Sequence, residues 1–295
     1  MIEYGRWLQE QLGYKCQKIA IDAGFTCPNR DGHLGTGGCT FCSNAAFNPR
    51  YCNPLKSVTT QLEEGKVFFN KKFNKLKYIA YFQAYTGTYA DDKQCIHLYE
   101  EALSVKDICG IIIATRPDCM SPQLLDYLAQ LRKRTFVMIE YGVESANDQT
   151  LLRINRGHDF STSQRKICET AALGIPVGAH IILGLPGEDR KEVLRQARLI
   201  ARLPLSAIKL HQLQIIRGTA LAKEYEQNPW PMPSAQEYVR LAADYLSLFP
   251  QDMAVDRIVS SIPPDMLVAP RWGLKNHEIT EMLREIWTEL TNNSK

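Results

Sequence analysis

The sequence predicts an α/β protein, a partial (β/α)6 TIM-like barrel with a helical extension at its C-terminal end. Short apolar segments rich in β-branched residues alternate with longer amphipathic ones over the first 217 residues, which is typical of parallel β/α units. Most of these apolar segments are nearly continuous runs, such as Gly-Ile-Ile-Ile-Ala at 110–114, as expected for strands buried on both faces. Hydrophobic residues make up 45% of the chain and charged residues 23%, which excludes disorder, collagen and coiled coil.

The elements follow one another in regular alternation. Apolar segments predict six strands, at 18–22, 76–83, 109–115, 135–143, 175–183 and 207–216. Amphipathic segments between them predict five helices, at 57–74, 91–104, 121–132, 161–173 and 188–203. Ser121 is suited to the N-cap of the third helix, Pro122 to its first helical position, and Gly174 to the end of the fourth.

The pattern changes after about residue 217. Prolines recur there, at positions 229, 231, 233, 263, 264 and 270, and two further helices are expected at 234–248 and 276–290. We therefore expect residues 1–217 to form the core barrel with an N-terminal lead-in. Residues 218–295 should form an extension packed on that barrel rather than an independent domain.

Charge and cysteine content limit the class of protein. There are 35 basic and 32 acidic side chains, a net charge of +3, which neither names nor excludes a nucleic-acid partner. No apolar run approaches the ~20 residues of a membrane helix, and the first residues lack the basic and apolar regions of a signal peptide. Nine cysteines, an odd number, do not suggest a disulfide framework. We expect a cytoplasmic protein with no membrane partner.

Polar side chains gather where the predicted strands end. In parallel barrels the chemistry lies at these carboxyl ends. The residues concerned are Gln83, Thr86, Thr115, Arg116, Tyr141, Glu144, His180, His211 and Gln214. Any one of them could be an ordinary satisfied polar residue, but several together predict a functional site.

Three clustered cysteines, Cys27, Cys39 and Cys42, follow the first predicted strand. Eleven residues separate the first two and two separate the last pair, with four glycines in the longer interval. A [4Fe–4S] cluster held by three thiolates keeps one iron open for a small molecule, whereas electron-transfer clusters usually have four. Zinc is the alternative, because His33 could complete a closed Cys3His site. The spacing alone leaves both metals open.

The cysteine loop resembles that of radical S-adenosylmethionine (radical SAM) enzymes. Cys-Pro-Asn-Arg-Asp-Gly at 27–32 and Gly-Gly-Cys-Thr-Phe-Cys at 37–42 are similar to the YhcC/YtqA-type subfamily. That subfamily is related to the catalytic subunit of Elongator and to oxygen-independent coproporphyrinogen dehydrogenases. Further matching motifs occur in chain order at 81–89, 114–118, 141–145, 155–158, 184–188 and 216–219. The resemblance implies a barrel of the radical SAM type and favours a cluster over zinc.

The resemblance also implies a chemistry. A [4Fe–4S] cluster on Cys27, Cys39 and Cys42 would bind S-adenosylmethionine and receive one electron from a donor such as flavodoxin or ferredoxin. Cleavage of the sulfonium would give methionine and a 5′-deoxyadenosyl radical, which would abstract a hydrogen atom from the substrate. So reactive a radical needs a dry, enclosed site. The protein binds and orients the reactants, while the cofactor carries the hard chemistry.

Individual contacts with S-adenosylmethionine are implied for six residues: the Phe41 backbone at the adenine, Gln83 and Thr86 near the methionine amino group, Glu144 and His180 near the ribose, and Arg156 at the methionine carboxylate. A planar guanidinium suits a carboxylate. Candidate residues of the substrate pocket are Tyr85, Tyr141, His211 and Gln214. No catalytic residue is assigned.

The substrate implied by the Elongator likeness is tRNA, modified at a wobble uridine. Basic side chains available for phosphates are Lys66, Lys71, Lys72, Lys75, Lys77, Arg132, Lys133, Arg134, Arg195, Arg198 and Arg202, although they could equally be solvated helix faces balanced by acids. One alternative is a radical SAM enzyme acting on a small metabolite or a porphyrin-like molecule. Another is a zinc-stabilised RNA-binding protein without catalysis.

Overall fold

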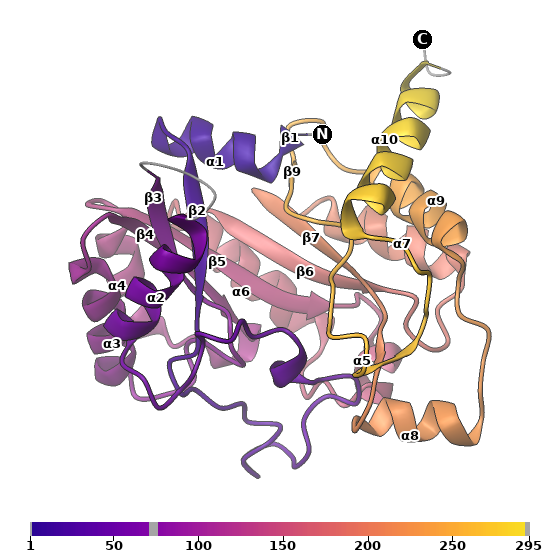
Figure 1. Cartoon of the computed structure of the whole chain (residues 1–295), viewed down its shortest axis with the longest axis horizontal. Coiled ribbons are helices and arrows are strands. Elements are labelled where there is room, and N and C mark those ends of the chain that lie inside the picture. Colours follow the sequence, from indigo (N-terminus) through magenta and orange to yellow (C-terminus); the bar gives the residue numbers. More distant parts are fainter. Residues whose placement is uncertain (1, 71–75, 293–295) are drawn as a thin grey trace.

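A curled parallel sheet forms the centre of the molecule in a computed structural model, which describes residues 2–70 and 76–292 (Figure 1). Its eight strands run in the order β1-β9-β7-β6-β5-β4-β3-β2, and every neighbouring pair is parallel. The six longest strands are β2 (Cys16–Ile21), β3 (Lys77–Phe82), β4 (Ile108–Thr115), β5 (Phe136–Glu144), β6 (Val177–Leu183) and β7 (Ala207–Gln212). This arrangement confirms the predicted partial α/β barrel.

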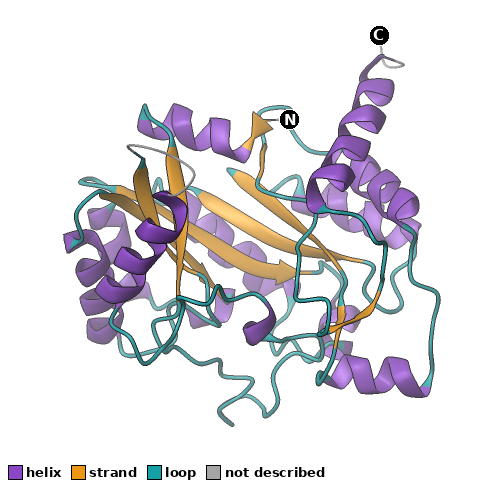
Figure 2. Ribbon diagram, in the orientation of Figure 1, coloured by secondary structure: helices purple, strands orange, loops and turns teal. Residues whose placement is uncertain are grey.

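Helices cover the outer face of the sheet (Figure 2). The five that correspond to the predicted helices are α2 (Val58–Asn70), α3 (Asp92–Ser104), α4 (Pro122–Leu131), α6 (Phe160–Ala172) and α7 (Arg190–Ile200). Ser121 caps α4 as predicted, its Oγ accepting from the Leu124 backbone N–H at 3.0 Å. The main hydrophobic core lies between these helices and the outward-facing strand residues. The predicted end of the first of these helices, at 71–74, lies outside the described residues.

The amino-terminal end of the barrel is closed by two elements that the sequence reasoning did not predict, β1 (Ile2–Glu3) and α1 (Tyr4–Leu12). The α1 side chains Tyr4 and Trp7 are buried against inward-facing residues such as Met138. The rings of Trp7 and Phe136 meet at 6.3 Å, edge to face. The inner floor is therefore apolar at its base, and any cavity must open at the opposite, carboxyl end of the strands.

The last predicted strand, 207–216, is wrong as a single element. It divides into β7 and the short β8 (Ile215–Ile216), and β8 pairs antiparallel with β10 (Leu267–Ala269) in a separate small sheet. Leu213 and Gln214 separate the two strands, and the Leu213 N–H still donates to Leu183 O at the end of β6. Gln212 and Gln214 both line the cavity at the carboxyl end of the barrel.

Residues after 217 contribute to the barrel itself. Strand β9 (Ala254–Val255) lies between β7 and β1. Helices α9 (Ala235–Leu246) and α10 (Asn276–Asn292) correspond to the two predicted ones, and α5 (Asp148–Arg153) and α8 (Ala220–Gln227) are additional. Nowhere in the described ranges is a helix both long and apolar enough to cross a bilayer.

Candidate functional site

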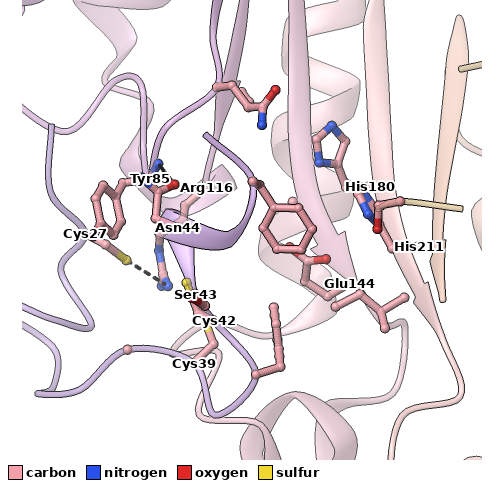
Figure 3. Close-up of a pocket in the computed structure, with 18 of the residues that line it drawn as sticks. Cys27, Cys39, Cys42, Ser43, Asn44, Tyr85, Arg116, Glu144, His180 and His211 are labelled. Carbon is pink, nitrogen blue, oxygen red and sulfur yellow. Dashed lines mark hydrogen bonds between the residues drawn. The ribbon is translucent and has the colours of Figure 1, made fainter. Parts of the chain in front are cut away.

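A cavity of about 220 Å³ opens at the carboxyl ends of the strands. All but one of the predicted site residues line it: Cys27, Cys39, Phe41, Cys42, Gln83, Tyr85, Thr86, Glu144, Arg156, His180, His211 and Gln214. In Figure 3 the three cysteines lie on one side of this cavity, and His180 and His211 lie on the other. Residues far apart in the sequence thus converge on one cavity.

Tyr141 is the exception, and its prediction as a pocket residue is wrong. Its ring is fully buried in the outer core, and its hydroxyl lies 2.8 Å from Thr170 Oγ1 on α6. Successive side chains of a strand point to opposite faces, so Glu140 and Gly142 line the cavity and Tyr141 between them cannot.

The cysteine loop is folded by its own backbone. The Arg30 N–H donates to Cys27 O at 2.8 Å, and the Cys42 N–H donates to Cys39 O at 3.0 Å. Gly37 and Gly38 both have positive φ values, 85° and 83°, a conformation that glycine adopts without strain. This lets the loop reverse just before its second cysteine, so that all three thiols face the cavity.

Asn29, which the sequence reasoning missed, ties this loop to the barrel. Its buried Nδ2 donates to Asn155 O at 2.5 Å and to Arg156 O at 3.0 Å, and it lies 3.8 Å from Cys39 Sγ. A Cβ on Gly157 would lie 2.4 Å from Asn29 Oδ1, so only glycine permits this approach. The sequence signals were the asparagine in Cys-Pro-Asn and the glycine after Arg156. Neither residue indicates from the sequence alone that the other is its partner.

Two buried arginines direct their guanidinium groups at the cysteine sulfurs. Arg116 Nη1 lies 3.9 Å from Cys27 Sγ while its other nitrogens bind Asp118 at 2.9 and 2.7 Å. Arg156 Nη1 lies 3.7 Å from Cys39 Sγ. Nearby cations stabilise thiolates. At Cys42, burial raises the pKa of the thiol to about 11, and the neighbouring Cys39 adds to this effect. A metal bound at this thiol would favour the deprotonated form.

Arg156 and Glu144 form the second part of the site. Arg156 Nη2 donates to Gly142 O at 2.5 Å and lies 3.7 Å from Glu144 Oε1. Glu144 has a φ of 67°, where the register between β5 and β6 shifts, as at the bulges that re-aim side chains near active sites. Burial raises the pKa of Glu144, and the Arg156 charge opposes this. Within the described chain, Arg156 Nε is buried without a hydrogen-bond partner.

The inner end of the cavity carries a buried charge network, also missed. Glu140 Oε2 accepts from Tyr81 Oη and bonds to His180 Nε2, both at 2.7 Å, and Lys209 Nζ lies 3.4 Å away. Burial opposes ionisation of Glu140, but the charges of Lys209 and Lys18 hold its pKa well below the usual range. Burial, with Lys209 adding to it, lowers the pKa of His180 to about 4. The sequence signal for this network was the presence of charged residues within otherwise apolar strands.

Three thiols facing one cavity fit an iron–sulfur cluster with an open iron. Cluster thiolates bind different irons, and hydrogen-bond donors lie 3.7–3.9 Å from two of the three sulfurs. The closed zinc site would need His33, which is exposed and lines a separate hollow beside Asp118 and His158. Among residues 2–70 and 76–292, no three His, Cys, Asp or Glu side chains are grouped to hold one metal ion.

Comparison with known proteins identifies relatives of similar length. The chain is 39% identical to YtqA of Bacillus subtilis (strain 168) over 272 residues, which is 92% of this chain and 84% of YtqA. It is 36% identical to YhcC of Escherichia coli (strain K12) over 270 residues, 91% of this chain and 86% of YhcC. A tRNA uridine(34) acetyltransferase of Dehalococcoides mccartyi is more distant, 25% identical over 60% of this chain and 39% of that protein.

The fold is shared with a solved structure of Elp3 from the archaeon Methanocaldococcus infernus. The TM-score is 0.70 at 16% sequence identity, covering 98% of this chain and 64% of the Elp3 chain. At this identity the likeness concerns the fold alone.

Two family models together match most of the chain. Residues 29–200 match the radical SAM superfamily, and residues 205–288 match the radical SAM C-terminal domain. The cofactors of this superfamily are a [4Fe–4S] cluster and S-adenosylmethionine, the two that the resemblance of the cysteine loop implies. The chain is therefore a radical SAM enzyme, a member of the radical SAM superfamily related to YtqA and YhcC.

Proposed function

We propose that this enzyme modifies a uridine of tRNA by radical chemistry, with its cluster held by Cys27, Cys39 and Cys42. The observation that carries the first half is the single cavity that joins three thiols to the Arg156–Glu144 pair. When bound, the cluster and S-adenosylmethionine supply a carbon radical that abstracts hydrogen from a substrate. The electron is expected from a small donor protein such as flavodoxin or ferredoxin.

The chain's own residues bind and orient S-adenosylmethionine in this proposal. Arg156, close to Cys39, pairs with the methionine carboxylate through its unpartnered Nε. Glu144 accepts hydrogen bonds from ribose hydroxyls, and the Phe41 backbone contacts the adenine. Gln83 and Thr86, at the end of β3, lie on the cavity wall where they suit the methionine amino group. These contacts exclude water from the reacting atoms.

The choice of tRNA rests on similarity. The D. mccartyi relative is named for tRNA uridine 34, and the fold is that of Elp3. Several of the basic side chains considered for phosphate binding pair with acids instead: Lys66 with Glu63, Lys77 with Asp107, Arg134 with Glu100 and Arg195 with Glu192. Lys71, Lys72 and Lys75 lie outside the described residues. RNA contacts are therefore expected mainly at the cavity mouth.

A small-molecule substrate is the second candidate. Either substrate would enter the same cavity, a metabolite as a whole molecule and tRNA through a single flipped-out base.

The cluster assignment is tested by cysteine replacement. Cys27→Ala, Cys39→Ala and Cys42→Ala should each abolish the cluster absorption after anaerobic reconstitution, together with 5′-deoxyadenosine formation in the presence of dithionite. Cys168→Ala, at an exposed thiol, is the matched control and should keep both. Full cluster content in any of the three variants would remove that cysteine from the ligand set.

The substrate assignment is tested on cellular tRNA. Nucleosides from a strain lacking the gene should lack a modified uridine that returns with the wild-type gene but not with the Cys42→Ala gene. Identical nucleoside profiles in all strains, with an enzyme that still cleaves S-adenosylmethionine, would replace tRNA by a small-molecule substrate.

A further inference from the structure

We propose that Arg257 and His211 form a subsite for an oxoanion of the substrate, a carboxylate or a phosphate, on the cavity wall away from the cysteines. This proposal rests on the proposed function, because it takes the same cavity as the substrate pocket. It adds that the substrate must carry an oxoanion, either a carboxylate or a phosphate.

Backbone hydrogen bonds hold Arg257 in position. It follows β9, and its carbonyl accepts from the Leu210 N–H of β7 at 2.8 Å, while the Asp256 N–H donates to Ile208 O at 2.9 Å. Arg257 is half-buried and lines the cavity. In the part of the chain that is described, its Nε is buried with no hydrogen-bond partner. The guanidinium is thus presented to the cavity by backbone that is already fixed.

The fully buried cations of the cavity are compensated. Arg116 binds Asp118 at 2.7 Å, Arg156 lies 3.7 Å from Glu144, and Lys209 lies 3.4 Å from both Glu140 and Asp256. For Arg257, residues 2–70 and 76–292 provide neither an ion pair nor a side-chain hydrogen bond. Removing a charged group from water without a partner is unfavourable, so an anionic ligand that covers the half-buried Arg257 would supply the missing partner.

His211 supplies a second donor in the same cavity, and it follows Leu210, whose N–H binds the Arg257 carbonyl. Its ring lies 5.5 Å from that of His180, and its nitrogens bond to no other described residue. Burial, with the Arg257 charge next in effect, holds the pKa of His211 well below its usual value, so its ring is neutral and offers one N–H. Figure 3 shows both histidines across the cavity from the three cysteines.

The subsite is distinct from the proposed site of the methionine carboxylate. That carboxylate belongs to Arg156, which contacts Cys39 Sγ on the opposite side of the cavity. A planar guanidinium binds either a carboxylate or a phosphate through two parallel hydrogen bonds. The group bound by Arg257 therefore belongs to a second molecule, and the test must tell the two oxoanions apart.

Equilibrium dialysis of the cluster-loaded enzyme with S-adenosylmethionine present is the direct test. Radiolabelled phosphate and radiolabelled acetate are measured in separate arms at constant ionic strength, with chloride as the competing control. We expect saturable binding of one equivalent of one oxoanion, displaced by the other but not by chloride. The tighter-bound probe identifies the substrate group as phosphate or carboxylate.

Variants assign the binding to these residues. Arg257→Gln should weaken binding at least tenfold, and Arg257→Lys should weaken it less because the charge remains. His211→Asn, which keeps the Arg257 charge, should weaken it severalfold and serves if Arg257→Gln does not load its cluster. Arg165→Gln is the matched control, at an exposed arginine of α6 that pairs with Glu169, and should leave the affinity unchanged.

Two results would overturn the subsite: no saturable binding of either probe, or equal affinity in the wild type and in folded, cluster-loaded Arg257 and His211 variants. These binding results can be told apart from a failure of the proposed function. That failure would be seen as a wild-type enzyme that forms no 5′-deoxyadenosine or that leaves tRNA unmodified, and neither of these is measured by dialysis.

Discussion

Lys18 Nζ lies 2.7 Å from Asp256 Oδ2, and this ion pair joins the two sides of the curled sheet. Lys18 is on β2, at one edge of the strand order, whereas Asp256 follows β9, next to the other edge. No backbone ladder among the described strands joins β2 to β9, so side chains take its place. Glu140 and Lys209 extend the pair into a network across the inner end of the cavity.

Breaking this network should destabilise the barrel. Lys18→Met removes one cation from beside two buried carboxylates, and such a loss costs about 3–5 kcal/mol. Urea unfolding at neutral pH should show a correspondingly lower midpoint. Arg6→Ala, which breaks the exposed Arg6–Glu10 pair at 2.9 Å, should cost less than about 1 kcal/mol. Equal small losses in both variants would show that the network does not close the barrel.

Arg156→Lys should weaken binding of S-adenosylmethionine by at least tenfold while leaving the fold intact. Lysine keeps the charge but cannot reach Gly142 O, Cys39 Sγ and a ligand carboxylate together, as the planar guanidinium can. Calorimetric titration of the cluster-loaded enzyme measures the affinity. Arg153→Lys, three residues away in an exposed pair with Glu224, is the control. An unaltered affinity in Arg156→Lys would assign the methionine carboxylate elsewhere.

Gly142→Ala tests whether the Arg156–Glu144 geometry is needed. The added Cβ would lie 2.6 Å from Arg156 Nη2 and 2.7 Å from Glu144 Oε1, so both side-chain ends must move. Affinity for S-adenosylmethionine should fall about tenfold or more, in the same titration. Gly5→Ala, on α1 with nothing within 4 Å of the new Cβ, should bind normally and be more stable by up to about 1 kcal/mol. Normal binding by Gly142→Ala would contradict the expectation.

His180 should make stability depend on pH between about 6.5 and 4. Its pKa is lowered to about 4 by burial and by Lys209, so the unfolded chain takes up this proton first as the pH falls. Stability from this group is therefore complete above pH 6.5 and lost toward pH 4, by at most about 3 kcal/mol. His180→Gln should flatten that part of the unfolding profile, whereas His97→Gln, at an exposed histidine of α3, should leave it as it was. A profile unchanged by His180→Gln would refute this.

The alternation of apolar and amphipathic segments was sufficient to predict the class of fold and the six longest strands, although the last of them was predicted too long. These strands can be predicted from the sequence because a strand buried on both faces must be apolar along its whole length. The three cysteines were equally readable, since their spacing within one glycine-rich loop is a local property. Elements whose role depends on distant partners were missed. Helix α1 and strand β9 are short, and only their packing against the base of the barrel stabilises them.

The sequence by itself determined the barrel, the thiol loop and the polar character of the strand ends. Tertiary structure alone decided which polar residues share the cavity, because that depends on strand register and on which face of each strand turns inward. Glu140 lines the cavity and Tyr141 does not, because adjacent side chains of a strand point to opposite faces. Asn29, Lys18 and Arg257 acquire their roles only through partners or neighbours far along the chain, and no local pattern records such a distance.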